Sequence, residues 1–170
     1  MAETFTLYKL IVLYMLDWVD FPLTNSQISE FILDKGYTTY FRLQSALAEL
    51  TDSGLLKIEL THNRTLYNLT EEGAATINYF RNKISPEIRQ EIDNFINEKK
   101  YDLKEEVSVK SDYYLNTNHE YEVKCQILEN GSHLIDMTLT VPTQTEAEAI
   151  VNNWNRKNQE IYALLLSQLL

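Results

Sequence analysis

The sequence predicts an α+β fold: an N-terminal winged helix-turn-helix, then a three-stranded antiparallel sheet packed against a long C-terminal helix. Two stretches of the 170-residue chain predict this class. Residues 37–69 read as a helix, a glycine stop and two short strands joined by a polar turn, which is the order of a recognition helix followed by its wing. Residues 103–141 place apolar side chains at every second position, the period of half-buried antiparallel strands.

The composition narrows the classes of function. Hydrophobic residues make up 44% of the chain, which is ordinary for a packed globular protein. The net charge is −10; residues 1–85 hold 7 Lys and Arg against 10 Asp and Glu, and residues 86–170 hold 8 against 15. Because DNA-binding proteins gain affinity from basic side chains on phosphates, any DNA contact must come from a local basic patch.

Three features bear on the cellular compartment. The N-terminus Met-Ala-Glu-Thr has no positively charged segment, so no signal peptide is expected. The longest apolar run, residues 10–16, is too short to span a bilayer. The single cysteine, Cys125, excludes an intramolecular disulfide. We therefore expect a cytoplasmic protein without a membrane segment.

The first 36 residues predict two helices. Residues 4–18 are apolar around most of the helix circumference, which predicts burial on more than one side. Thr24 followed by Gln27 is a capping box that opens the second helix, and Gly36 ends it. The short connection from Gly36 to the next helix is the one that a helix-turn-helix requires.

The third helix is predicted over about residues 40–51. Its apolar stripe consists of Tyr40, Leu43, Leu47 and Leu50. Gly54 suits a left-handed C-cap. Residues 55–60 and 65–69 then alternate as the two strands of a hairpin whose polar turn is residues 61–64.

Two further helices complete the first half and begin the second. One is predicted over about residues 70–83, with Ile77 and Phe80 on its core face. Ser85 and Pro86 then begin a helix that runs to about Lys100. This break divides the chain into a predicted winged-helix domain, residues 1–84, and a domain for dimerisation or sensing, residues 85–170.

Three strands follow, with apolar residues at odd positions. The inward-facing sets are Leu103, Val107, Val109 and Tyr113; Tyr121, Val123, Cys125 and Ile127; and Ile135, Met137, Leu139 and Val141. Asn130-Gly131 predicts a hairpin turn. A strict two-residue turn would pair Ile127 with Leu134 and turn the apolar residues of one strand outward. We therefore predict a three-residue loop or a β-bulge.

The final helix follows a second capping box, Thr143 and Glu146. Its stripe consists of Ala147, Val151, Trp154, Ile161 and Leu165, interrupted by Asn158. The last turns carry more apolar surface than one face can bury, at Leu164, Leu166, Leu169 and Leu170. Together with the apolar first helix, this surplus predicts a homodimer; packing within one chain is the alternative.

The chain as a whole resembles a bacterial family of uncharacterised proteins, a domain of unknown function. The resemblance is carried by residues 5–16 (FTLYKLIVLYML), residues 21–28 (FPLTNSQI), Glu49-Leu50 and Gly54-Leu55. It implies an N-terminal winged helix similar to that of PadR-like transcriptional regulators, without catalytic residues or an established ligand. Residues 47–55 (LAELTDSGL) also look like the end of the recognition helix in many bacterial regulators.

The sequence has no motif typical of an enzyme: no glycine-rich phosphate loop, CxxC, HExxH or GxSxG. We therefore expect no catalytic activity and no cofactor. His119, His133 and Glu120 could bind a metal, but surface histidines at turns are the simpler interpretation. The alternating pattern predicts a buried Cys125. An effector pocket would involve aromatic residues such as Trp154, Tyr113 or Tyr121, although aromatic residues at core spacing usually belong to the core.

The predicted contacts with double-stranded DNA lie on the third helix and the wing. Arg42 could bind guanine and Gln44 adenine in the major groove, while Thr38, Thr39 and Ser45 could bind phosphates. The wing adds Lys57, His62, Asn63 and Arg64. The sequence therefore predicts a dimeric transcriptional regulator. The alternatives are a winged-helix module that binds protein and a sensor of a small molecule.

Overall fold

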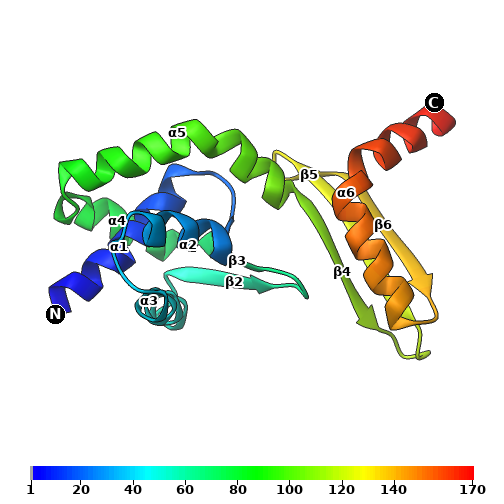
Figure 1. Cartoon of the computed structure of the whole chain (residues 1–170), viewed down its shortest axis with the longest axis horizontal. Helices are drawn as coiled ribbons and strands as arrows, with labels where there is room; N and C mark the ends of the chain where they lie inside the picture. The colour runs from blue at the N-terminus through cyan, green and yellow to red at the C-terminus, as the bar shows by residue number, and fades with distance from the viewer. Residues whose placement is uncertain (1) are drawn as a thin grey trace. The chain divides into compact units, whose positions relative to one another are not determined.

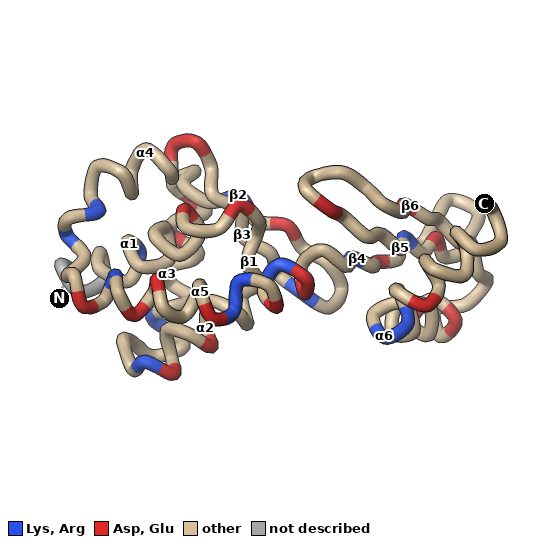
Figure 2. The backbone as a smooth tube through the Cα atoms, turned by 90° about the horizontal axis from the view of Figure 1, so that it is seen from above, with Lys and Arg blue, Asp and Glu red and all other residues tan. Residues whose placement is uncertain are grey.

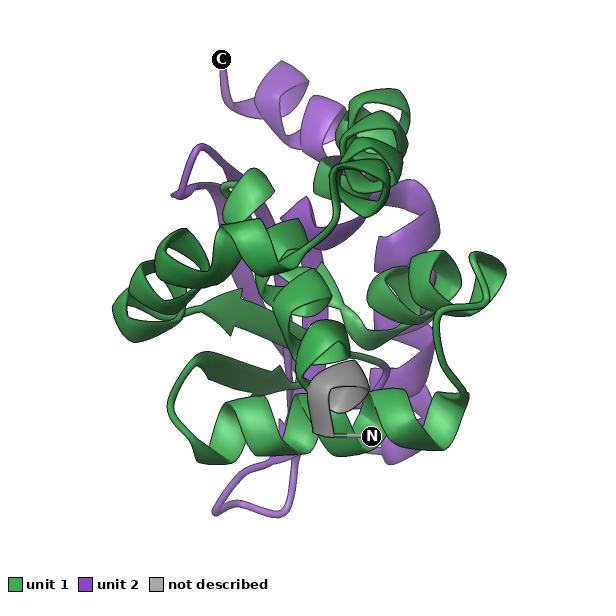
Figure 3. Cartoon of the chain, turned by 90° about the vertical axis from the view of Figure 1, so that its left-hand side faces the viewer, with its two compact units in different colours: residues 1–60, 64–104 green, residues 61–63, 105–170 purple. Residues whose placement is uncertain are grey.

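The computed structural model describes residues 2–170, with side chains from Thr6 onward, as a mixed α+β protein (Figure 1). The described part contains six α-helices and two three-stranded antiparallel sheets. The chain forms two compact units, residues 1–60 with 64–104, and residues 61–63 with 105–170 (Figure 3). The sequence places a domain boundary at residue 84, whereas the first compact unit extends to Lys104; the division into functional domains stays a prediction.

Unit 1 contains the predicted helices and hairpin. Its elements are α1 (Ala2–Trp18), β1 (Leu23–Thr24), α2 (Asn25–Asp34), α3 (Tyr40–Asp52), β2 (Leu56–Leu60), β3 (Thr65–Leu69), α4 (Glu71–Phe80), the 3-10 turn η1 (Arg81–Lys83) and most of α5 (Pro86–Ser108). The strand order is β1-β3-β2, all antiparallel. The β2–β3 hairpin confirms the prediction, while the two-residue strand β1, in which Leu23 pairs with Tyr67, was not predicted.

The ends of α2 and α3 are set by the local sequence, as predicted. The Thr24 hydroxyl accepts a hydrogen bond from the Gln27 amide at 3.0 Å, and the Gln27 side chain accepts one from the Thr24 amide at 2.9 Å. Gly36 and Gly54 follow the two helices with φ of +70° and +77°. The Tyr37 amide bonds back across Gly36 to the Ile32 carbonyl, and the Leu55 amide bonds across Gly54 to the Leu50 carbonyl. These bonds satisfy the last carbonyls of each helix.

The core of unit 1 surrounds α1. Ile11, Val12, Leu13 and Met15 are at most 1% exposed, which confirms that this helix is buried on several sides. Two predicted core residues are exposed instead. Tyr40 lies in the first turn of α3 and is 52% exposed. The buried stripe of this helix consists of Leu43, Ala46, Leu47 and Leu50. Phe80 is the last residue of α4, one turn beyond the buried Ile77, and is 40% exposed.

A carboxylate joins α5 to α1 within unit 1. Asp93 Oδ1 accepts hydrogen bonds from the Tyr14 hydroxyl and the Trp18 indole N–H, both at 2.8 Å. Burial and the bond to Asp93 raise the pKa of Tyr14. Asp17, also on α1, forms an ion pair with Arg81 of η1 at 2.6 Å. α1 therefore makes polar contacts as well as apolar ones.

The prediction that the first strand of the second half starts near Leu103 is wrong, because α5 continues to Ser108. Leu103 and Val107 are four residues apart and both buried, which is a helical spacing. A strand would require an apolar side chain at position 105, where the chain has Glu105. The alternating pattern therefore begins only at Val109.

Unit 2 is a sheet covered on one face by a helix. Its elements are β4 (Val109–Leu115), β5 (Tyr121–Glu129), β6 (Ser132–Val141) and α6 (Gln144–Leu169), with strand order β4-β5-β6. Asn130 and Gly131 form a two-residue turn with φ of +51° and +78°. Ile127 nevertheless pairs with Ile135, because the extra residue Leu134 forms a β-bulge. This bulge confirms the predicted change of register.

Trp154 is the centre of the unit 2 core. It is 2% exposed, and its indole N–H donates to the Gln126 carbonyl at 3.3 Å. Val123 and Cys125 of β5 are fully buried beneath α6. Leu139 was predicted to face inward but is 40% exposed, because it lies on the edge strand β6 and α6 packs mainly on β4 and β5. Asn158 is also buried and bonds to the carbonyls of Trp154 and Asn155.

The end of α6 exposes leucines. Leu164, Leu166, Leu169 and Leu170 are 58%, 39%, 77% and 100% exposed. Residues 161–170 contain no charged side chain. Among residues 2–170, no helix has both the length and the apolarity that crossing a bilayer requires.

Candidate nucleic-acid interface

Helix α3 has one buried face and one face that the fold leaves in solvent. The buried stripe packs in the core of unit 1. On the other face Thr39, Phe41, Arg42 and Ser45 are exposed. The Thr39 hydroxyl caps the helix by accepting from the Arg42 amide at 3.4 Å. Thus three of the predicted contacts, Thr39, Arg42 and Ser45, lie together on this exposed face.

Gln44 does not point away from the protein. Its side-chain carbonyl accepts from the Asn25 amide group at 2.8 Å, and its own amide group donates to the Asn25 carbonyl at 3.0 Å. Asn25 also accepts from the Ser29 hydroxyl at 3.0 Å. The pairing joins the start of α2 to the middle of α3. Gln44 would have to give up both bonds before it could bind an adenine.

Thr38 lies in the turn before α3, and its side chain is also less accessible than predicted. Its hydroxyl oxygen is buried and has no hydrogen-bond partner within residues 2–170. The neighbouring Tyr37 hydroxyl donates to Glu91 of α5. Burial, followed by this contact with Glu91, raises the pKa of Tyr37. This turn therefore packs toward α5, and Thr39 is the better-placed hydroxyl.

The charges of α3 are distributed unevenly along its length. Arg42 is the one charged residue in residues 40–48, and within the described chain its guanidinium forms no ion pair. Glu49 lies further along and pairs with Lys9 of α1 at 2.5 Å. Acidic residues are interspersed with the basic ones along the backbone, so the basic residues do not form one continuous stretch (Figure 2). The N-terminal half of α3 is thus its cationic half.

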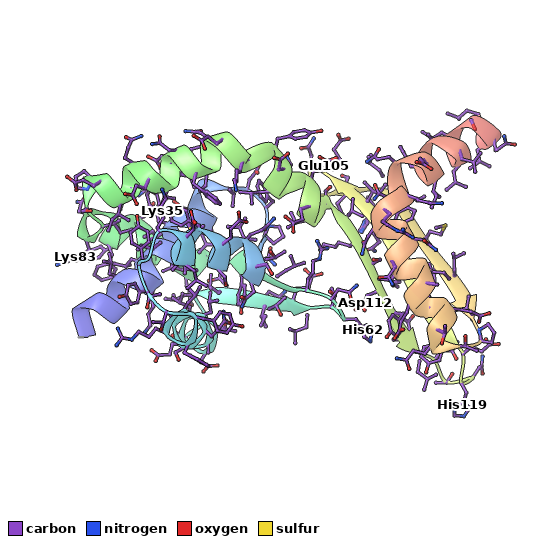
Figure 4. The ribbon with its side chains drawn as sticks, viewed as in Figure 1. Lys35, His62, Lys83, Glu105, Asp112 and His119 are labelled. Atoms are coloured by element: carbon purple, nitrogen blue, oxygen red, sulfur yellow. The ribbon has the colours of Figure 1, made fainter. Side chains whose placement is uncertain are left out.

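The predicted wing residues are not all in one place. Lys57 is exposed on β2, and Arg64 is partly exposed just before β3, both in unit 1. His62 and Asn63 belong to unit 2, where the His62 ring stacks on Tyr113 with centroids 3.8 Å apart and Nδ1 contacts the Asp112 carboxylate (Figure 4). Both residues line a cavity of about 290 Å³ with Tyr113 and three residues of α6, Glu148, Val151 and Asn152.

The sequence did not predict a second hollow, which lies in unit 1 between α2 and α5. It has a volume of about 340 Å³ and is lined by Glu30, Phe31, Asp34, Lys35, Glu91, Asn94, Phe95, Glu98 and Lys99. Lys99 donates to Glu30 at 3.0 Å and lies 5.3 Å from the centre of the Phe95 ring. The lining therefore contains one ion pair and an excess of carboxylates. No residue spacing in either helix predicts this hollow.

The residues considered for metal or redox chemistry are separated or buried. Within residues 2–170 no three His, Cys, Asp or Glu side chains come close enough to hold a metal ion. His119 is in a turn with φ of +60°, and His133 is exposed on β6. Burial raises the pKa of the Cys125 thiol to about 11, which keeps it protonated near neutral pH.

The comparison with protein families identifies the chain. The model of the family described as "Domain of unknown function (DUF4364)" matches residues 8–169, so the protein belongs to this family. No curated protein and no solved structure matches the chain.

Proposed function

We propose that the protein is a transcriptional regulator that binds double-stranded DNA through a winged helix-turn-helix in unit 1, in the manner of PadR-like regulators. The order α1, β1, α2, α3, β2, β3 and the sheet order β1-β3-β2 support this reading. α2 and α3 form the helix-turn-helix, α3 is the recognition helix, and the β2–β3 hairpin is the wing. No catalytic step or cofactor is part of the proposal.

The observation that carries the proposal is the exposed face of α3. The fold uses the buried stripe, the Thr39 cap and Gly54 to form this helix, and it uses none of Phe41, Arg42 or Ser45. The N-terminal residues of a recognition helix contact base edges. In this proposal Arg42 binds guanine, Thr39 and Ser45 bind phosphate, and Lys57 and Arg64 bind the flanking backbone.

Binding of genomic fragments tests this function. Purified protein is mixed with sheared genomic DNA at low and near-physiological salt, and the retained fragments are sequenced. We expect enrichment of a few fragments that share an inverted repeat, with affinity that falls as salt rises because counterions are released. Retention of all fragments at low salt and none at higher salt would indicate non-specific attraction only.

Arg42→Ala should weaken specific binding by about 1–3 kcal/mol, because a bidentate contact with guanine is lost. Fluorescence anisotropy with an enriched duplex measures the change. Arg156→Ala is the matched control, since Arg156 is an exposed arginine of α6 in unit 2. If Arg42→Ala binds like the wild-type protein, Arg42 does not belong to the interface.

We also propose that the regulator is a homodimer held by the end of α6. The segment 161–170 has no charged side chain, so two copies can pack there despite a net charge of −10 on each chain. A dimer would place two α3 helices on two half-sites and double a weak set of contacts. The exposed leucines supply apolar surface whose burial favours association.

Leu164→Asp should convert the dimer to a monomer, because it puts a charge in an apolar contact. Leu164 is 58% exposed, so the fold of the single chain should be unaffected. Sedimentation velocity measures the change in mass. Leu115→Asp is the control, since Leu115 is 54% exposed on β4. A dimer that survives Leu164→Asp would place the interface elsewhere.

A second function, a winged-helix module that binds protein, is favoured by one observation. α3 and β2 carry exposed apolar side chains, among them Phe41 at 82% and Leu60 at 69%. Such a module would retain no genomic DNA at either salt concentration. The capture experiment therefore separates the two functions.

A further inference from the structure

The first turn of α3 exposes two aromatic rings. Phe41 is 82% exposed and Tyr40 is 52% exposed. Their ring centroids lie 6.0 Å apart, with the planes at 77°. An edge-on contact of this kind is a favourable aromatic geometry. The fold gains no core packing from Phe41, so its apolar surface remains available to a partner.

The charges beside this pair favour an anionic partner. Arg42 follows Phe41, and the N-terminal end of a helix adds partial positive charge. The acidic residues of α3, Glu49 and Asp52, lie toward its other end, and Glu49 is paired with Lys9. The complementary surface is thus negatively charged and also offers an apolar group to Phe41.

Duplex DNA has both properties. Its phosphates carry the negative charge, and the 5-methyl groups of thymine are apolar contacts in the major groove. Gln44, the residue of α3 suited to adenine, is held by Asn25 through two hydrogen bonds. An A·T pair facing this helix can therefore be recognised through its thymine methyl group while Gln44 keeps its hydrogen bonds to Asn25.

We propose that Phe41 determines specificity by contacting a thymine 5-methyl group beside the base that Arg42 reads. The inference rests on the proposed function. In it Phe41, and not Gln44, is the residue that recognises an A·T pair. The Tyr40 ring contacts the Phe41 ring edge-on. The probe that isolates this contact is a duplex in which one methyl group is missing.

The experiment uses duplexes enriched in the genomic capture. Each thymidine of the bound site is replaced singly by deoxyuridine, which removes the methyl group and keeps the base pair. Wild-type protein should lose about four-fold in affinity at one thymine in each half-site, the effect of one buried methyl-sized group. Phe41→Ala should bind the unmodified duplex more weakly and lose nothing further with deoxyuridine.

Two variants provide controls. Phe41→Leu keeps an apolar side chain and should retain part of the response to deoxyuridine. Tyr79→Ala removes another exposed ring, which is 80% exposed in a pair with Phe80 at the end of α4, and should change neither affinity nor methyl response. Thermal unfolding of Phe41→Ala should match the wild-type protein, because the ring makes no core contact.

Three results would overturn the inference. They are an equal deoxyuridine response in wild-type and Phe41→Ala proteins, no response in the wild-type protein, and an unchanged affinity of Phe41→Ala. Failure of the wild-type protein to bind any duplex at low salt is a different result. It would overturn the proposed function and this inference with it, and would assign the aromatic pair to a protein partner.

Discussion

Trp154→Ala should lower the free energy of unfolding of unit 2 by about 3–5 kcal/mol, the range for removing a large aromatic side chain from a core. The ring is 2% exposed and lies against the sheet among Val123, Cys125 and Val151. Alanine would leave a cavity there and leave the Gln126 carbonyl without its indole partner. Both losses act on the same helix–sheet contact.

The two tryptophans of the chain allow a clean measurement. Trp18 lies in unit 1 and Trp154 in unit 2. Urea unfolding of the Trp154→Ala variant, followed by circular dichroism, should show the loss of stability, while the fluorescence of Trp18 reports unit 1 alone. Tyr114→Ala, at a residue of β4 that is 48% exposed, is the control and should cost little. A loss below about 1 kcal/mol for Trp154→Ala would contradict its central place in the core.

Asp93→Ala should lower the stability of unit 1 by about 2–4 kcal/mol, because each hydrogen bond to a charged acceptor contributes about 1.5–3 kcal/mol and the site is only partly buried. The substitution leaves the Tyr14 hydroxyl and the Trp18 indole N–H without their shared acceptor. Chemical unfolding measures the change when it is followed by fluorescence in a Trp154→Phe background, where Trp18 is the single tryptophan and also reports the new environment of its indole.

Asp102→Ala is the matched control for Asp93→Ala. Asp102 lies on the same helix, α5, but is exposed. A double-mutant cycle with Tyr14→Phe separates the share of the hydroxyl from that of the indole, since the effects of residues in contact do not add. Independent, additive effects of Asp93→Ala and Tyr14→Phe would show that the hydrogen bond contributes nothing.

The sequence predicted best where structure is decided within a few residues. The capping boxes at Thr24 and Thr143 and the stop at Gly54 depend on neighbours three or four positions away, and all three are present. The β-bulge after Ile127 could be predicted because the apolar residues of both strands have odd numbers, and only a shifted register turns both sets to the same face of the sheet. Local chemistry and binary pattern therefore defined most helix ends and the second hairpin.

The candidate site was harder to predict because it depends on contacts between distant residues. Gln44, at the margin of the outward face of α3, was predicted to bind adenine, yet its side chain bonds to Asn25, 19 positions away. Tyr40 had the spacing of the buried stripe, but this stripe begins only at Leu43, and Tyr40 in the first turn of α3 is 52% exposed. His62 was predicted to be a DNA contact of the wing because it lies in the turn of the hairpin. Its side chain instead contacts Asp112 and Tyr113, about 50 positions later in the sequence. No period in the sequence encodes such contacts.

The independence of the two faces of α3 has a consequence for how this family can diverge. Leu43, Leu47, Gly54 and the Thr39 cap are tied to folding, whereas Phe41, Arg42 and Ser45 are not. Substitutions of Phe41, Arg42 or Ser45 should leave the stability of unit 1 nearly unchanged and alter only the surface that α3 offers to a partner. Under the proposed function, descendants of one gene could thus acquire new DNA sites in single steps, without the destabilised intermediates that a change in the core would require.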